Sequence, residues 1–344
     1  MLLLLPLAFA ADPGFTVTPM GWLRPGFTWR DDDPALPSST DGFWLAARMG
    51  LEAGSETYRL RARIEVDLQP EPSLTDAFVN FTPSPVVSLN VGQFKVPYSL
   101  EYLAADTRRQ LAQNAPIVDA ASFGRDIGAS VETRLPIAQK VRATFSAGMF
   151  NGEGRNRLEN VNDRFLYALR LNVTPLGTRD RPYEGTSRDP YISVGGGYVY
   201  NFTGEDSTAV EVNAFQAELQ FSVSVFSLQG EYLDSEIVHA DAAVIDYHTR
   251  GAYGQFGCFI PAPWLRDHIE LAGRGGWMDP NTALDSAPTE VEQVSIDGGL
   301  NLYVPEAPKF MHDTKLQLAY RHTIELEGEE LANDRFDAVA SVRF

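Results

Sequence analysis

Three arginines, Arg59, Arg61 and Arg63, occupy alternate positions of one short segment, where their guanidinium groups could act together on an anion. Residues two apart in an extended strand point to the same face, so the spacing predicts a row of cations. A guanidinium presents planar donors that suit phosphate or carboxylate oxygens, and such a row could guide anions. Acidic neighbours such as Glu65 and Asp67 leave a second interpretation open, in which paired charges give no selectivity.

The segment that carries this row, residues 58–68, alternates strictly between apolar and polar residues. Alternation with a period of two predicts a strand with two different faces. Segment 43–52 alternates in the same way, and we expect its Arg48 to lie beside the row. The pattern recurs in segments 87–92, 126–132, 141–149, 164–173, 209–221, 223–232, 269–277 and 316–322. Segments of about ten residues suit tilted strands that cross a bilayer.

Turn-forming residues separate these segments, for example Asn151-Gly152-Glu153-Gly154 and Asp279-Pro280-Asn281. We count about 15 to 17 strands, and because bacterial single-chain barrels usually have an even number, we expect 16. No apolar stretch reaches the roughly 20 residues that a membrane helix needs. The predicted fold is therefore an all-β, 16-stranded antiparallel transmembrane β-barrel, with one polar face toward water and one apolar face toward lipid.

Both ends of the sequence agree with export to an outer membrane. Residues 2–11 form an apolar run that contains Ala8-Phe9-Ala10, a cleavage-site pattern, so residues 1–10 are interpreted as a signal peptide. The usual positive charges before such a run are absent, which indicates a truncated leader. Residues 11–344 would then form one barrel domain. The last alternating segment ends on Phe344, a candidate recognition signal for the barrel-assembly machinery.

Composition and motifs narrow the function classes. The net charge of −18, from 46 acidic and 28 basic residues, argues against a nucleic-acid partner. Cys258 is the single cysteine, which excludes an intramolecular disulfide and a cysteine-rich metal cage. No G-x-S-x-G, G-x-x-x-x-G-K-[ST] or H-E-x-x-H motif occurs. We therefore assign no catalytic residue, metal site or cofactor and expect that the protein is not an enzyme.

Two residue classes have competing interpretations. Acidic clusters at 31–33 and 325–330 could hold divalent cations shared with lipopolysaccharide, but a solvated loop is the preferred interpretation. Trp22, Trp29, Trp264 and Trp277 could pack in the interior, but their positions near predicted strand ends favour aromatic girdles at the membrane interfaces.

The segment Val91–Glu101, V-G-Q-F-K-V-P-Y-S-L-E, resembles the G-Q-F-K-x-P-[FY]-S-x-E motif of the phosphate-selective porin O and P family. Gly124–Gly128 and Gly148–Gly154 are similar to further pieces of the same family, in matching order and spacing. The resemblance implies a 16-stranded barrel, commonly a homotrimer, in outer-membrane lipid of a Gram-negative-type bacterium. It also implies a long third loop that folds into the lumen and narrows it.

Residues 95–126 occupy the position of that constriction loop, because alternation is lost from Ser99 to Ala121, where we expect a loop with one short helix. The loop adds Lys95, Arg108, Arg109 and Arg125 to the candidate anion contacts. Lys95 could contact passing anions, but its packing neighbours favour a role as an anchor to a wall carboxylate. Some family members select phosphate through an arginine ladder and a lysine cluster. This sequence has only four lysines, at 95, 140, 309 and 315, which puts phosphate selectivity in doubt.

The sequence thus predicts an outer-membrane porin for passive diffusion of small hydrophilic solutes, and the arginine row favours anions such as phosphate. Two alternatives belong to other classes: a β-barrel enzyme on the outer rim, and a soluble secreted β-sandwich that binds a ligand. A barrel should change its gel mobility on heating in detergent and fractionate with outer membranes, which discriminates it from a soluble sandwich.

Overall fold

The computed structural model describes residues 14–31, 33, 41–139, 141–177, 190–265, 267–284, 291–304 and 314–344. The expected signal peptide, residues 1–10, lies outside them. The strands are β1 (Thr16–Arg30), β2 (Gly42–Ser55), β3 (Leu60–Asp67), β4 (Ser73–Ser84), β5 (Val87–Lys95), β6 (Arg125–Ala138), β7 (Val141–Phe150), β8 (Leu166–Leu176), β9 (Tyr191–Thr203), β10 (Val210–Val223), β11 (Phe226–His239), β12 (Tyr247–Phe259), β13 (Ile269–Asp279), β14 (Gln293–Tyr303), β15 (Lys315–Glu325) and β16 (Arg335–Arg343).

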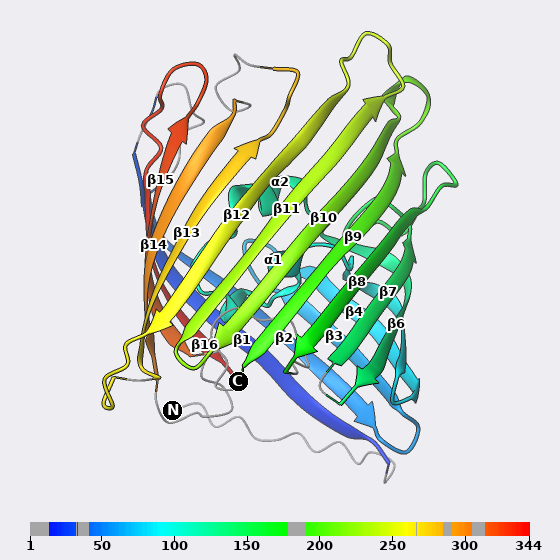
Figure 1. Cartoon of the computed structure of the whole chain (residues 1–344). Helices are drawn as coiled ribbons and strands as arrows, with labels where there is room; N and C mark the ends of the chain where they lie inside the picture. Colours follow the sequence, from blue (N-terminus) through cyan, green and yellow to red (C-terminus); the bar gives the residue numbers. More distant parts are fainter. Residues whose placement is uncertain are drawn as a thin grey trace.

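Each strand pairs antiparallel with its sequence neighbours, and β1 also pairs with β16, so that the sheet closes into a barrel (Figure 1). Trp22 of β1 lies opposite Arg343 on one side and Arg48 on the other. The 16-stranded antiparallel barrel is therefore confirmed. The alternative of a soluble sandwich is wrong, because one sheet closes on itself instead of packing against a second sheet.

Strand β3 illustrates how alternation sorts side chains between the two faces. Ala62 and Ile64 are exposed on the outer surface, whereas Arg61, Arg63 and Glu65 point into the lumen. The expectation that the strand begins at Tyr58 is wrong. Arg59 lies in the preceding turn with a φ of 53°, so it does not continue the row on the strand.

The girdle interpretation fails for Trp22. Its side chain points into the lumen and is only 7% exposed, because Arg48 stacks on the indole at 4.8 Å from the ring centroid. Trp29 and Trp264 are exposed, at 40% and 75%. A lumen position for Trp22 follows from strand register, which alternation alone does not supply.

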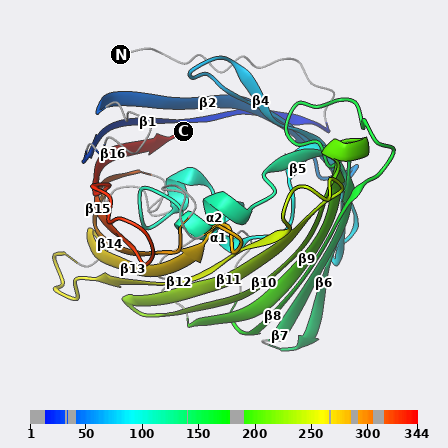
Figure 2. The same cartoon turned by 90° about the horizontal axis from the view of Figure 1, so that it is seen from above.

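Residues 96–124, which connect β5 to β6, lie inside the barrel (Figure 2). This inner loop contains α1 (Leu100–Leu103), a 3₁₀ turn η1 (Asp106–Arg108) and α2 (Pro116–Ala121), rather than the single short helix that we expected. A second 3₁₀ turn, η2 (Asp206–Thr208), lies between β9 and β10. Among the described residues, no helix is long and apolar enough to cross a membrane.

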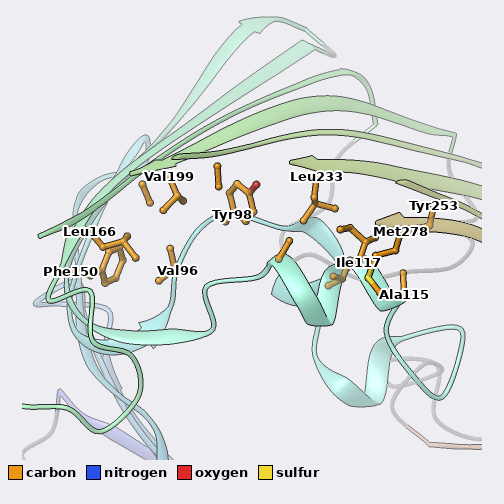
Figure 3. Close-up of a cluster of buried hydrophobic side chains, with 14 residues drawn as sticks. Val96, Tyr98, Ala115, Ile117, Phe150, Leu166, Val199, Leu233, Tyr253 and Met278 are labelled. Carbon is orange, nitrogen blue, oxygen red and sulfur yellow. The ribbon is translucent and has the colours of Figure 1, made fainter. Parts of the chain in front are cut away.

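The hydrophobic core lies inside the lumen, between the inner loop and the wall (Figure 3). Tyr98 and Ile117 of the loop pack near Leu233 of β11 and Met278 of β13. The lumen face of these strands is therefore partly apolar, because the inner loop rather than water covers it. This burial draws the loop to one side of the barrel.

Carboxylates of the wall hold the beginning of the inner loop. Glu231 of β11 accepts hydrogen bonds from the backbone N–H groups of Leu100, at 2.8 Å, and Glu101, at 2.7 Å, and from the hydroxyl of Tyr253, at 2.8 Å. A carboxyl oxygen at the start of a helix accepts from N–H groups that have no partner within the helix. The wall thus fixes where α1 begins.

A buried ion pair holds the middle of the loop. Arg274 of β13 contacts Glu101 of α1 at 2.7 Å, and both side chains are fully buried. Arg274 also contacts Asp297 of β14 at 2.9 Å, and Asp297 contacts Arg321 of β15 at 2.7 Å. Because a buried ion that loses its partner is strongly destabilised, this network fixes the position of the loop.

The remaining anchors lie along Arg109 to Asn114. The side chain of Gln110 donates to Glu270 of β13 at 2.6 Å, and its backbone carbonyl accepts from Asn301 at 2.8 Å. Arg321 donates to the carbonyl of Asn114 at 2.7 Å. All of these partners come from β13–β15. Arg24 of β1 adds one contact from the opposite side, to the carbonyl of Ala112 at 3.3 Å. The inner loop is therefore fastened mainly to one half of the barrel, and the half that includes β2–β6 and β16 leaves room for a passage.

We predict that Glu101→Ala raises the single-channel conductance and lowers the temperature at which the folded band disappears on detergent gels. Loss of one partner of a buried pair costs about 3–5 kcal/mol, and the freed loop no longer narrows the lumen. Glu159→Ala, at an exposed position between β7 and β8, is the matched control. Unchanged conductance in Glu101→Ala would show that the ion pair does not hold the loop.

A second prediction concerns the lipid face. Val79 lies on the outer surface near the middle of β4, and Asn80 beside it lines the lumen. Val79→Arg should destabilise the folded barrel in lipid by about 2–4 kcal/mol, because a charge near the bilayer midplane is costly. Asn80→Arg should be tolerated. Unfolding in guanidinium measures both variants, and equal effects would contradict the assignment of the two faces.

Candidate functional site

A cavity of about 490 Å³ lies between the inner loop and the opposite wall, and we call it the constriction cavity. It is lined by Trp22, Arg48, Arg61, Arg63, Glu65, Asp76, Lys95, Leu103, Ala105, Arg108, Arg125, Arg134 and Arg343. Eight of these residues are cationic and two are acidic. The cavity wall is thus strongly positive although the whole chain carries a net charge of −18.

The cations come from separate elements that closure of the barrel brings together. Strands β2, β3, β5 and β6 each contribute, β16 adds Arg343 from the far end of the sequence, and η1 adds Arg108. The pairing of Trp22 with both Arg48 and Arg343 explains how the first and last strands meet at this cavity. Distance along the sequence therefore does not reveal the cluster.

The arginine row was expected either to face passing anions or to pair with acidic neighbours, and the structure shows some of each. Arg63 contacts Glu65 at 2.8 Å and Asp76 at 3.7 Å, and Arg125 contacts Asp76 at 2.7 Å. Arg61 approaches Glu52 only to 3.8 Å, and 39% of its side chain is exposed. Carboxylates hold these arginines in place, but they are fewer than the cations that line the cavity.

Lys95 lies at the junction of β5 and the inner loop. Its ammonium group donates to the backbone carbonyls of Tyr102, at 2.5 Å, and Ala104, at 2.9 Å. Cations at the end of a helix satisfy carbonyls that have no partner within it. Lys95 thus anchors the loop through carbonyl groups and not through the wall carboxylate that we expected. It also lines the constriction cavity.

Three candidates lie apart from the cavity lining. Arg59 donates to the carbonyl of Pro83 near the end of β4. Arg109 is not among the residues that line the cavity; its side chain pairs with Asp106, and its backbone carbonyl accepts from Lys315. Phe344 pairs through its backbone with Gly21 at the beginning of the barrel wall. The fold brings six of the candidate anion contacts together in the lining of the constriction cavity: Arg48, Arg61, Arg63, Lys95, Arg108 and Arg125.

A second, wider cavity of about 1020 Å³, here called the vestibule, opens near the turns that end β2 and β4. Its lining includes Arg59 and the polar side chains of Asn80, Ser88 and Asn90. Arg61 and Arg134 line both cavities. The vestibule and the constriction cavity are therefore adjacent, and these two arginines lie where the wider cavity meets the narrower one.

Sequence reasoning missed four residues near the constriction cavity: Trp22, Asp76, Arg134 and Arg343. Arg134 and Arg343 do lie on alternating segments with charged faces, which is a usable signal. Selecting them requires the pairing of β1 with β16 and of β5 with β6, which the sequence pattern does not give. Arg24 of β1 was also missed, and it is buried against the carbonyl of Ala112 in the inner loop.

Comparisons with solved structures show the same barrel fold. The anion-selective porin from Comamonas acidovorans has a TM-score of 0.61 and 12% identity, with 96% of this chain and 100% of that chain covered. Salmonella typhi OmpF, in complex with daunomycin, has a TM-score of 0.65 and 12% identity, with 96% and 98% covered. Vibrio cholerae OmpT, in its trimer form, has a TM-score of 0.62 and 12% identity, with 96% and 100% covered. At these identities the likeness establishes the fold.

The family follows from a sequence comparison. None of the curated proteins matches the chain. The family model of the phosphate-selective porin O and P proteins matches residues 41–323, which is most of the chain and includes β2 through most of β15. The protein therefore belongs to the phosphate-selective porin O and P family and is a passive porin, a multi-pass β-barrel of the outer membrane.

Proposed function

We propose that the protein favours small hydrophilic anions over cations as they diffuse through the outer membrane. The observation that carries this proposal is the lining of the constriction cavity, with eight cations and two carboxylates. Charges that line a narrow, low-dielectric passage concentrate ions of opposite sign. Solutes move down their own gradient, and no chemical step is involved, so the proposal is for a channel and not for an enzyme.

In this mechanism an anion enters from the vestibule and first meets Arg61 and Arg134, which line both cavities. It then passes Arg63, Lys95 and the other cations of the constriction cavity. Repeated weak contacts allow entry without trapping, as conduction requires. The acidic residues of outer loops contribute to a different field, so the net charge of the chain does not oppose this preference.

The contacts of the lysines favour a general preference for anions over phosphate selectivity through a lysine cluster. Lys95 and Lys315 both donate to backbone carbonyls of the inner loop. The other two lysines, Lys140 and Lys309, lie outside the described residues. Arginines thus supply most of the positive charge in the constriction cavity.

The test is the reversal potential of the protein in a planar bilayer under a KCl gradient. We expect an anion-selective wild-type channel. Arg63→Ala should lower the chloride-to-potassium permeability ratio about two- to fivefold, because it removes one unit charge within a few ångströms of the path. Arg59→Ala is the matched control and should change the ratio little, because Arg59 donates to the carbonyl of Pro83 in β4 and does not line the constriction cavity. A cation-selective wild-type channel would refute the proposal.

Assembly partners form a second part of the proposal. We propose a homotrimer in contact with outer-membrane lipid and lipopolysaccharide, since the trimer form of OmpT has the same architecture. Phe344, whose backbone pairs with Gly21 and whose side chain is 54% exposed, would be read by the barrel-assembly machinery before the barrel closes.

Deleting Phe344 should reduce the heat-modifiable trimer recovered from outer membranes several-fold, because the assembly signal and two backbone hydrogen bonds to β1 are lost together. Phe336→Leu, on the same strand, is the control. Unheated gels and cross-linking give the oligomeric state. A wild-type protein that runs as a monomer would contradict the trimer, and normal yield after the deletion would contradict the role of Phe344.

A further inference from the structure

The vestibule differs from the constriction cavity in the chemistry of its wall. Its volume is about 1020 Å³, and five neutral side chains that can hydrogen-bond line it: Asn80, Thr82, Ser84, Ser88 and Asn90. Of the described residues that line the constriction cavity, none is a serine, threonine, asparagine or glutamine. Neutral hydrogen-bonding groups are therefore concentrated on one side of the narrow passage.

Strand register places several of these groups in a row that begins at a cation. Arg61 of β3 lies opposite Asn80 of β4, which lies opposite Asn90 of β5. Asn90 in turn lies opposite Ser130 of β6. Side chains that face each other across neighbouring antiparallel strands have Cβ atoms about 4.5–5.5 Å apart. One small solute can therefore contact the guanidinium group and both amides at once.

The side chains of this wall hold one another in position. The amide of Asn80 donates to the hydroxyl oxygen of Ser88 at 2.6 Å and to the amide oxygen of Asn90 at 2.8 Å. The hydroxyl of Thr82 donates to the amide oxygen of Asn80 at 3.2 Å. Because these contacts already order the wall, a solute that binds there has few side chains left to immobilise.

Amide and hydroxyl side chains both donate and accept hydrogen bonds. A hydroxyl group of a solute does the same, so it can replace water at either kind of group. A halide ion or a carboxylate only accepts and gains nothing from the amide oxygens of Asn80 and Asn90. The wall therefore suits solutes that carry hydroxyl groups.

The charges of the vestibule are more nearly balanced than those of the constriction cavity. Three arginines, Arg59, Arg61 and Arg134, line it together with Glu56 and Glu132. Arg134 pairs with Glu132 at 2.6 Å, but 46% of the arginine side chain is exposed. Exposed ion pairs are weak, so an anionic group of a solute can compete for such an arginine. Charge attracts the anionic group, and the neutral wall distinguishes what the anion carries.

We propose that the vestibule is a binding site for small anions that also carry several hydroxyl groups, such as a hexose phosphate. The anionic group binds Arg61 or Arg134, and the hydroxyl groups bind the row formed by Asn80 and Asn90. This inference rests on the proposed anion preference and adds a class of solute to it. Binding raises the concentration of such solutes where the vestibule meets the constriction cavity.

The experiment measures block of the chloride current in planar bilayers by glucose 6-phosphate and by cyclohexyl phosphate. Both are phosphate monoesters with a six-membered ring, but only glucose 6-phosphate has hydroxyl groups on that ring. We expect glucose 6-phosphate to reach half-maximal block at a concentration about three- to tenfold lower, because one or two added hydrogen bonds contribute about that factor. Equal half-blocking concentrations, or a lower one for cyclohexyl phosphate, overturn the inference.

Asn90→Ala should lower this preference for glucose 6-phosphate about threefold, because it removes an amide from the middle of the row. Asn213→Ala is the matched control, since Asn213 accepts a hydrogen bond from Tyr198 and lines neither cavity. It should keep the wild-type preference. The inference fails if Asn90→Ala also keeps that preference, or if Asn213→Ala loses it to the same extent.

Thr82→Val keeps the shape of the wall and serves should Asn90→Ala fail to fold. It replaces a hydroxyl by a methyl group and should lower the preference about twofold, and an unchanged preference contradicts the inference. The reversal potential of the wild type separates the two proposals. A cation-selective wild type refutes the anion preference, whereas an anion-selective wild type that both esters block equally refutes only the vestibule site.

Discussion

Closure of the sheet between β1 and β16 is the constraint on which the rest of the structure depends. In hydrocarbon, every backbone N–H and C=O group needs a partner within the protein, and only a closed sheet provides one for each strand. Closure also creates the constriction cavity, because it places Arg343 next to Trp22 and Arg48. The same constraint therefore explains both how the chain spans the membrane and how distant cations meet.

The inner loop turns this symmetric cylinder into an asymmetric channel. One half of the wall, β10–β15, supplies polar and charged groups that bind the loop, including Glu231 and Arg274, and apolar residues that bury its side chains. On the other side of the loop, the constriction cavity is lined by cations of β2, β3, β5, β6 and β16. The passage therefore has an excess of cations, although Glu65 and Asp76 also line it and Arg274 lies among the groups that hold the loop. An interior with mixed charges can in this way have a passage with a net positive charge.

Alternation and chain ends were sufficient to predict the barrel, its 16 strands and the inward-facing positions of Arg61 and Arg63. They did not predict that Arg59 lies in a turn, because alternation extends before the start of β3 to Arg59, which has a left-handed backbone conformation. Trp22 was misassigned for a related reason: it lies near the middle of β1, and the sequence does not show which face of that strand points into the lumen. The positions of both residues depend on strand register and tertiary contacts.

The inner loop was recognised from a family motif and a loss of alternation, but its anchors were not predictable. Glu101 and Arg274 are 173 residues apart and meet only after β13 has taken its place in the wall. Their types are ordinary for a barrel interior, so sequence alone gives no reason to pair them. Likewise, Asp106 is one of 46 acidic residues, and only the fold surrounds it with cations.

The central claim is that the open half of the lumen forms an anion path. The most direct test is anomalous diffraction from crystals soaked separately in bromide and in rubidium. The account predicts bromide peaks in the constriction cavity within contact distance of Arg63, Lys95 or Arg125, and no rubidium there. Rubidium peaks at those side chains without bromide would contradict it.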